Sequence, residues 1–307
     1  MHPASSIIVF TTFSGMGFGL IAMLGLGAAP SDGTAGFVTC ALAFILTSVG
    51  LASSTFHLGH PERAWRALSQ WRSSWLSREG ALAAVTLGLF AIYAVLWIFA
   101  DDRVAPIGVL LTVLSIVTVY ATAMIYGSLK TVPRWQTGLT PLCYLLFAAA
   151  GGALLAAALS SLLGAFSETA VLTALGLMVV AWVAKFVWWG RADRTTLGSN
   201  GSSPETATGL GHIGKVRLLE APHSSPNYLM KEMVYRVGRK HARKLRLLAV
   251  ALGGAVPVLG LLAAIALDGG AFFLVVAVLS HLIGMLAERW LFFAEAEHSV
   301  SLYYGHR

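Results

Sequence analysis

The sequence has few charged residues and only two cysteines. Asp, Glu, Lys and Arg make up 11% of its 307 residues, whereas an ordinary soluble domain carries roughly 25%. Hydrophobic residues make up 57%, which excludes intrinsic disorder. Cys40 and Cys143 lie in separate apolar runs, a pattern that excludes a disulfide framework. Two thiols are also too few for an iron–sulfur cluster, which needs about four such ligands.

Long apolar runs are what the sequence has in abundance. A helix that spans a bilayer needs about 20 mostly apolar residues, and the runs are too continuous for the alternating pattern of a membrane barrel. Eight runs of this length occur, at residues 6–29, 36–56, 80–100, 105–126, 141–163, 169–189, 245–267 and 271–293. The sequence therefore predicts an all-α fold, a polytopic membrane bundle of eight transmembrane helices forming one domain over residues 1–307.

The basic residues are distributed unevenly between the loops. The chain has 21 Lys and Arg, and a net charge of +7. If successive loops alternate between the two sides of the bilayer, every base except Arg103 falls on the side of the N terminus, with Lys185 and Arg289 near helix ends facing that side. Because Lys and Arg in short loops are retained in the cytoplasm, we expect both termini to be cytoplasmic. This segregation accounts for the basic excess as topology and leaves no reason to invoke a nucleic-acid partner.

The longest connection, residues 190–244, forms a basic loop in this topology. Residues 195–211 are rich in Ser, Thr and Gly, as linkers are. Residues 227–246 mix apolar and basic positions, which predicts a basic amphipathic helix along the membrane surface leading into the seventh span. Two interpretations remain open: a topology anchor in contact with lipid, or a surface that docks an acidic partner.

The stretch His57 to Glu79 carries the densest chemistry, with two His, four Arg, two Glu and three Trp. The Trp residues are typical of an interfacial aromatic belt. His57 and Glu79 lie at the ends of two spans, where an ionisable group is costly unless it serves a site. A quinone is a lipid-soluble carrier whose oxygens exchange protons. A quinone site at His57, Arg63, Arg78 and Glu79 is thus one interpretation, and a salt-bridged structural loop is the other.

Other polar residues lie inside or beside the spans. His281 and Glu288 share one face of the last span and are candidates for a proton path or a second wall of the pocket; an interhelical hydrogen bond is equally plausible. Tyr126 and Trp135 are placed to complete the pocket. No two His lie at matching depth in the spans, so we expect no heme.

Three segments resemble the membrane anchor subunit of dimethyl sulfoxide reductase and its relatives. They read FHLGHPERAWRALSQWRSSWLSRE, YGSLKTVPRWQTGLTP and GMLAERWLFFAEAEH. The resemblance implies a bacterial inner-membrane complex with a ferredoxin-like iron–sulfur subunit and a molybdopterin catalytic subunit. It implies that this chain binds quinone (menaquinone or ubiquinone) and holds no metal and no catalytic residue. It transfers quinol binding to His57 and Glu79 and to the neighbouring Arg63, Ser77 and Arg78. It also implies that the first span lines the site, where Ser14 and Thr12 would offer hydroxyls.

The expected topology bears on the substrate of the partner subunit. The family resemblance implies two arrangements. In the dimethyl sulfoxide reductases the catalytic subunits are exported, whereas in the sulfite-oxidising relatives the catalytic subunits stay in the cytoplasm. With the His57 loop in the cytoplasm, we expect a sulfite dehydrogenase type of complex that reduces quinone. The alternatives are an anchor for a reductase of dimethyl sulfoxide or another S- or N-oxide, an anchor without a quinone site, and a secondary transporter that uses His281 and Glu288.

Overall fold

Eight helices of the computed structural model are long and apolar enough to cross a membrane, within the residues that the structure describes. These residues are 2–30, 33–57, 60–100, 103–220, 237–268 and 270–304. The spanning helices are α1 (Ser5–Leu26), α2 (Gly33–Ser53), α3 (Trp75–Ala100), α4 (Ala105–Gly127), α5 (Leu139–Leu162), α6 (Glu168–Ala192), a seventh span made of three segments, and α11 (Ala271–Ala294). The predicted all-α polytopic bundle is confirmed.

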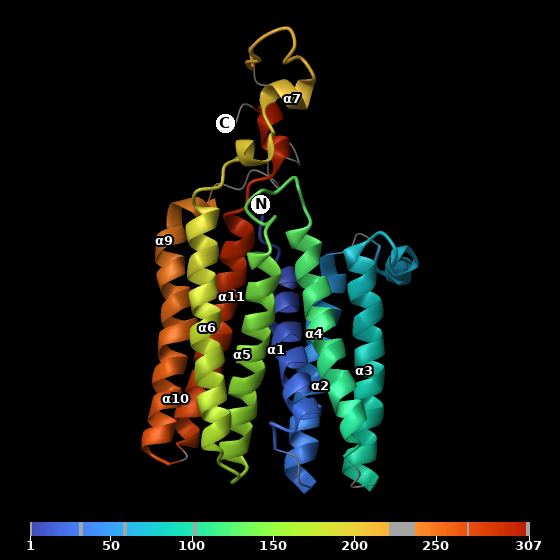
Figure 1. Cartoon of the computed structure of the whole chain (residues 1–307), viewed down its shortest axis with the longest axis vertical. Coiled ribbons are helices and arrows are strands. Elements are labelled where there is room, and N and C mark those ends of the chain that lie inside the picture. The colour runs from blue at the N-terminus through green and yellow to red at the C-terminus, as the bar shows by residue number, and fades with distance from the viewer. Residues whose placement is uncertain are drawn as a thin grey trace.

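The spans run side by side along the long axis of the molecule (Figure 1). The helix α1 lies in the middle and packs against α2, α4, α5 and α11. The helices α3 and α4 lie on one side of it, and α6 with the seventh span lies on the other. Most of the residues of α1 and α5 are buried, while α3 and α6 present large apolar side chains outward, as expected of helices that face lipid. Polar side chains of α1 and α5 are therefore held inside protein.

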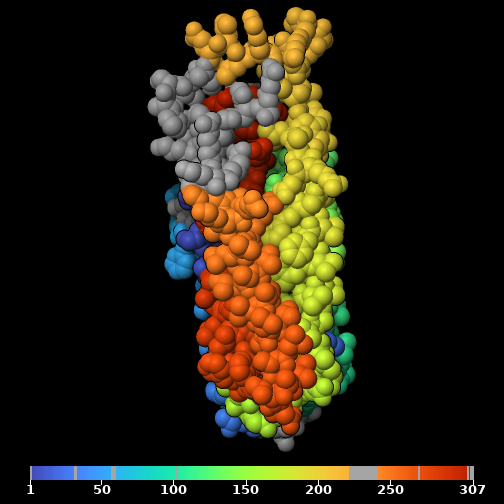
Figure 2. All heavy atoms as spheres, turned by 90° about the vertical axis from the view of Figure 1, so that its left-hand side faces the viewer, coloured from blue at the N-terminus to red at the C-terminus, as the bar shows by residue number. Residues whose placement is uncertain are grey.

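The end of the bundle at which α1 begins is called here the N-side. Because the number of spans is even, α11 finishes at the same end (Figure 1). The connections on this side include two 3-10 helices, η1 (Ser54–His57) and η2 (Pro61–Gln70), between α2 and α3. The short helices η3 (Leu197–Asn200), α7 (Pro204–Thr208) and η5 (Ser299–Tyr304) also lie on this side. Figure 2 shows the segment after α6 projecting beyond the N-side end of the bundle.

The seventh span consists of α9 (Val237–Val250), the π-helical turn η4 (Ala251–Ala255) and α10 (Val256–Ala266). The predicted amphipathic helix of residues 227–246 falls partly outside the described residues, which resume at Val237. From there the chain is helical without interruption into the apolar part of the span. The described basic turns thus continue the axis of the seventh span, and whether the helix lies along a surface stays a prediction.

The central helices α1 and α5 cross at glycines. A Cβ added to Gly152 would lie 2.1 Å from the carbonyl carbon of Gly19, and a Cβ on Gly19 would lie 1.9 Å from the carbonyl oxygen of Ala148. Small residues of this kind let helix backbones approach in membranes. On the far side, Arg103 donates to the Leu24 carbonyl at 3.1 Å. Arg103, the one basic residue assigned to the far side of the bilayer, therefore caps the end of α1.

Candidate functional site

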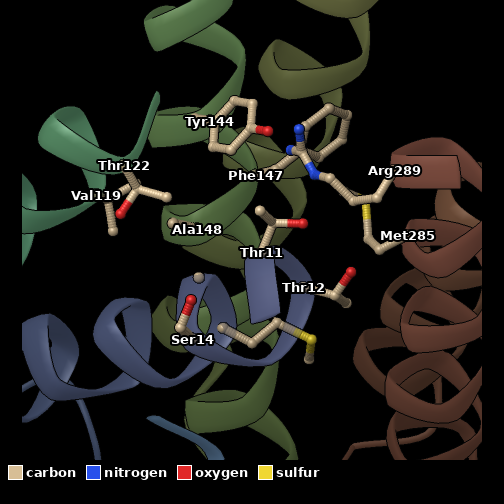
Figure 3. Close-up of a pocket in the computed structure, with 12 residues that line it drawn as sticks. Thr11, Thr12, Ser14, Val119, Thr122, Tyr144, Phe147, Ala148, Met285 and Arg289 are labelled. Atoms are coloured by element: carbon tan, nitrogen blue, oxygen red, sulfur yellow. The ribbon is translucent and has the colours of Figure 1, made fainter. Parts of the chain in front are cut away.

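A small cavity lined by both polar and apolar side chains lies among α1, α4, α5 and α11 (Figure 3). Its lining is Thr11, Thr12, Ser14, Gly15, Met16, Val119, Thr122, Tyr144, Phe147, Ala148, Met285 and Arg289. The cavity volume is about 20 Å³, and roughly 10–15 Å³ suffices for one water. The space thus suits a single oxygen atom or water with donors around it.

Hydroxyl groups on the first span form one side of this cavity. Thr11 donates to the Ile7 carbonyl at 2.9 Å, and Ser14 donates to the Phe10 carbonyl at 2.5 Å. The buried Thr12 hydroxyl has no hydrogen-bond partner among the described residues. Because buried hydroxyls are almost always paired, the Thr12 group indicates a missing partner at this place. The sequence prediction that Ser14 lines a pocket agrees with its position, although its role stays a prediction.

Three buried charged residues lie beside the cavity. Arg289 Nε is 3.2 Å from Glu288 Oε2, and Lys185 Nζ forms an ion pair with Glu288 Oε1. The exposed fractions of Lys185, Glu288 and Arg289 are 1%, 0% and 3%. The Arg289 guanidinium carbon lies 3.9 Å from the centre of the Tyr144 ring, and Figure 3 shows the Arg289 side chain reaching toward Tyr144 and Phe147. The group carries two positive charges and one negative charge when ionised.

His281 lies two turns from Glu288 on α11 and is fully buried. Its Nδ1 is 2.8 Å from the Gly253 carbonyl, which also accepts a 3.0 Å hydrogen bond from Trp182 Nε1. The π-helical turn η4 contains Gly253, and such turns leave carbonyls free of the regular helical ladder. A carbonyl only accepts, so in a neutral ring Nδ1 carries the proton and Nε2 is a lone-pair acceptor, which has no partner among the described residues.

Glu79 lies in the first turns of α3 and is 5% exposed. Its Oε1 has no hydrogen-bond partner among the described residues. It is close enough to Tyr126 for the two side chains to interact electrostatically, and Tyr126 in turn stacks on Tyr144 with ring centres 6.0 Å apart. Tyr144 also contacts the Arg289 guanidinium, so the aromatic pair links the surroundings of Glu79 to the Arg289 side of the cavity.

The connection before α3 is fastened to that helix. Ser77 donates to the Ala67 carbonyl. Arg78 donates to the carbonyls of Trp71 at 2.9 Å and Arg72 at 2.6 Å, and its guanidinium lies 4.4 Å from the Trp75 ring centre. These bonds hold η2 and the residues after it against the first turn of α3.

A profile described as DMSO reductase anchor subunit (DmsC) matches residues 1–295. The chain belongs to this family. The C subunit of sulfite dehydrogenase from Allochromatium vinosum is 32% identical over 326 aligned residues, which span 99% of each sequence. The C chain of anaerobic dimethyl sulfoxide reductase from Escherichia coli is 32% identical over 127 residues, or 39% of this chain and 43% of the relative. The YnfH chain of anaerobic dimethyl sulfoxide reductase from the same organism is 28% identical over 163 residues, or 50% and 56%. No solved structure matches.

The five residues predicted to bind quinone in this anchor subunit do not form one cluster among the described side chains. Arg63 is exposed, 3.7 Å from Glu62, and is separate from the cavity lining. The backbone of His57 ends η1, and its side chain lies outside the described residues. Ser77 and Arg78 bind the connection as given above. Only Glu79 of the five residues assigned to quinone is described as both buried and unpartnered.

The remaining predicted residues are built into the packing of the anchor subunit. Trp135 donates to the Phe292 carbonyl at 2.9 Å and stacks on the Phe292 ring, and Tyr126 meets Trp135 edge to face. The sequence interpretation passed over Lys185 and Tyr144 as site residues, whereas it named Thr12 together with Ser14. A signal existed for Lys185, because a lysine within an apolar span is costly unless it is paired.

A second ionic group joins four segments at the N-side. Arg246 binds Asp193 through two hydrogen bonds of 2.7 Å and also donates to Glu295. Arg134 donates to Asp193 at 2.8 Å and to Glu295 at 2.9 Å. The hydrogen bonds from Arg246 and Arg134 lower the pKa of the Asp193 carboxyl to about 2. This group clamps α6, the seventh span, α11 and the α4–α5 connection together.

Proposed function

We propose that this anchor subunit binds quinone and passes electrons between it and an iron–sulfur subunit, in a complex with a molybdopterin-bearing catalytic subunit. The observation that carries the proposal is Glu79, a buried carboxyl group with an unpartnered oxygen at the N-side edge of the bundle. An ionisable group so placed is a functional-site candidate by default. Among the residues that the structure describes, no cluster of three or more His, Cys, Asp or Glu is arranged to hold a metal.

The residues at hand fit a quinone head group. A bound quinone supplies the capacity to take up two electrons and two protons. Glu79 and His57 are the groups that exchange protons with its oxygens, because a carboxyl and an imidazole both titrate within reach of neutral pH when their surroundings shift them. Ser77 and Arg78 hold the connection against the turn of α3 that carries Glu79. Arg63 stays exposed on the same connection, where it is placed to meet the iron–sulfur subunit.

We further propose that the N-side is cytoplasmic in a bacterial inner membrane and that the complex oxidises sulfite. The segregation of bases supports the first part, since Lys and Arg in short loops mark the cytoplasmic side. The relative named for sulfite dehydrogenase supports the second, because it aligns along 99% of both sequences. The relatives named for dimethyl sulfoxide reductase align over half of this chain or less. An S- or N-oxide reductase is accordingly the second candidate.

The test uses the complex of this anchor with its catalytic and iron–sulfur partners in membranes. Sulfite-dependent reduction of decylubiquinone is compared with sulfite-dependent reduction of a soluble dye that bypasses the anchor. We expect Glu79→Gln and His57→Ala to lower the quinone-linked kcat about 100-fold, the scale of general acid–base catalysis, and to leave the dye-linked rate unchanged. The matched control is Glu168→Gln, an exposed carboxyl group at the far end of α6.

Full quinone-linked activity in both variants would contradict the quinone site and leave a mechanical anchor. A reporter fused after Arg307 checks the orientation independently. We expect a fused fluorescent protein that folds only in the cytoplasm to fluoresce. Activity of a fused enzyme that matures only outside the cytoplasmic membrane would contradict the proposed orientation. Turnover with dimethyl sulfoxide in place of sulfite would favour the second candidate.

A further inference from the structure

The ionic group of Lys185, Glu288 and Arg289 has an excess of one positive charge. All three side chains are nearly or fully buried, and the described ion pairs use the single carboxylate for both cations. A buried pair of one acid and one base is neutral and needs nothing more. A third buried charge is expensive unless a further partner compensates it. Within this group the extra cation has no anion of its own, so a group with acceptor oxygen beside Arg289 would stabilise it.

The cavity is the place where such a partner fits. Arg289 lines it, whereas Lys185 and Glu288 do not. The lining also includes hydroxyl-bearing residues of α1, among them Thr12, whose oxygen has no partner among the described residues. A guanidinium only donates hydrogen bonds, and a hydroxyl can donate one as well. An acceptor oxygen in this small volume can therefore bind both groups.

The surroundings of Arg289 hold it in place. Glu288 pairs with its Nε at 3.2 Å, and the Tyr144 ring lies against the guanidinium plane. Lys185 engages the other oxygen of Glu288 and lies 4.0 Å from the Trp188 ring centre. Because Lys185 and Glu288 act on the cavity through Arg289, they orient it and set its charge without touching the space themselves.

We propose that Arg289 binds one carbonyl oxygen of the quinone head group in this cavity, with Thr12 as a second donor. Lys185 and Glu288 are positioning residues for that contact. The proposal rests on the proposed quinone function and adds a second oxygen-binding group to the side defined by His57 and Glu79. A structural salt bridge alone would not require the third charge or place it in the lining of a cavity that also contains an unpartnered hydroxyl.

The test measures binding by the full-length protein in lipid nanodiscs, without turnover. Decylubiquinone quenches tryptophan fluorescence, and titration gives a dissociation constant. A hydrogen bond to a charged group corresponds to roughly a 10- to 100-fold change in affinity. We expect Arg289→Gln to raise the dissociation constant by about that factor, and Arg289→Lys and Thr12→Val to raise it by smaller factors. The control is Arg243→Gln, an exposed arginine on α9.

Arg289→Gln leaves Lys185 and Glu288 as a neutral pair, which favours a folded variant. If it nevertheless fails to fold, Lys185→Met serves instead, because it removes the excess charge from a distance and is expected to raise the dissociation constant severalfold. Unchanged affinity in the folded variant, within a factor of two, overturns the inference. The two proposals fail in different ways. If quinone does not quench the fluorescence of the natural protein, the quinone function itself is contradicted. If the natural protein binds quinone and the Arg289 or Lys185 variant binds it with the same affinity, only the role of Arg289 is contradicted.

Discussion

The buried ionic group makes an asymmetric prediction about stability. Glu288→Gln removes the one anion that separates two buried cations, and Lys185→Met removes one cation and leaves a neutral Glu288–Arg289 pair. The two substitutions each delete a single charge from the same group. The first variant keeps two buried cations, and the second keeps a neutral pair. The difference in their unfolding free energies therefore measures the cost of uncompensated charge, separately from the loss of a contact.

The magnitude follows from the burial of the group. The side chains involved are at most 3% exposed, so water does not screen what is left behind. Breaking a buried ion pair by removing one partner typically costs about 3–5 kcal/mol, whereas replacing a charge by an apolar group that leaves a neutral pair costs little. Hydrogen bonds between membrane helices average only about 0.6 kcal/mol. The cost of unpaired charge therefore outweighs the lost hydrogen bonds, and Glu288→Gln should be the more harmful change by about 3 kcal/mol.

The assay is thermal unfolding of the full-length protein in one detergent or nanodisc preparation, followed by tryptophan fluorescence. For a protein of this size, 1 kcal/mol corresponds to about 2 °C, so we expect Glu288→Gln to unfold about 6–10 °C below the natural protein. Lys185→Met should unfold within about 2 °C of it. Equal midpoints for the two variants would refute the reasoning, because the excess positive charge would then have no energetic consequence.

Two further predictions concern packing and pH. Gly152→Ala forces a Cβ to within 2.1 Å of the Gly19 backbone. We expect it to cost about 3 kcal/mol through overpacking and to lower the unfolding midpoint, whereas Gly176→Ala, where nothing lies within 4 Å, should be neutral or slightly stabilising. A destabilised Gly176 variant with a normal Gly152 variant would contradict the close crossing. The second prediction concerns Asp193, whose pKa of about 2 is depressed below its usual value near 3.9. Its stabilisation is present above about pH 4 and is lost as the pH falls to about 2. Asp193→Asn should thus unfold about 2 °C below the natural protein at pH 7, since partial exposure limits the effect to about 1 kcal/mol, and the difference should vanish near pH 2. A difference that persists unchanged at pH 2 would contradict the charged bond to Arg246.

The spanning helices were predictable because the bilayer imposes a length and an apolar composition that the sequence displays openly. The predicted and observed boundaries agree within a few residues for most spans. The third span begins at Trp75, five residues before its apolar run. The extra turn contains Ser77 and Arg78, which bond back to carbonyls of the preceding connection. Polar residues at the end of a span lower the mean hydropathy of the window, so the span is predicted too short. In the folded protein their hydrogen bonds to other segments stabilise the helix there.

The sequence did not predict how each spanning helix is rotated about its axis. The charge count places Lys185 and Arg289 near helix ends on the N-side, but it does not predict that the two side chains meet. In the structure both turn inward and share Glu288. A span that is apolar on every face carries little information about which face meets protein and which meets lipid. For the same reason Tyr144 was indistinguishable from an ordinary residue of the bundle until the neighbouring helices were placed.

The charges of the site are coupled through a single proton. The ionic group of Lys185, Glu288 and Arg289 sums to +1, and Glu79 contributes −1 only when it is ionised. Glu79 and the ionic group are all buried, so their charges interact with little screening by water. With Glu79 ionised the whole site is neutral, and with Glu79 protonated it is positive. Negative charge that arrives at the site is therefore stabilised most when Glu79 holds its proton. In the proposed function, this arrangement makes uptake of electrons and uptake of a proton favour each other, and it assigns Glu79 to proton exchange and Arg289 to binding.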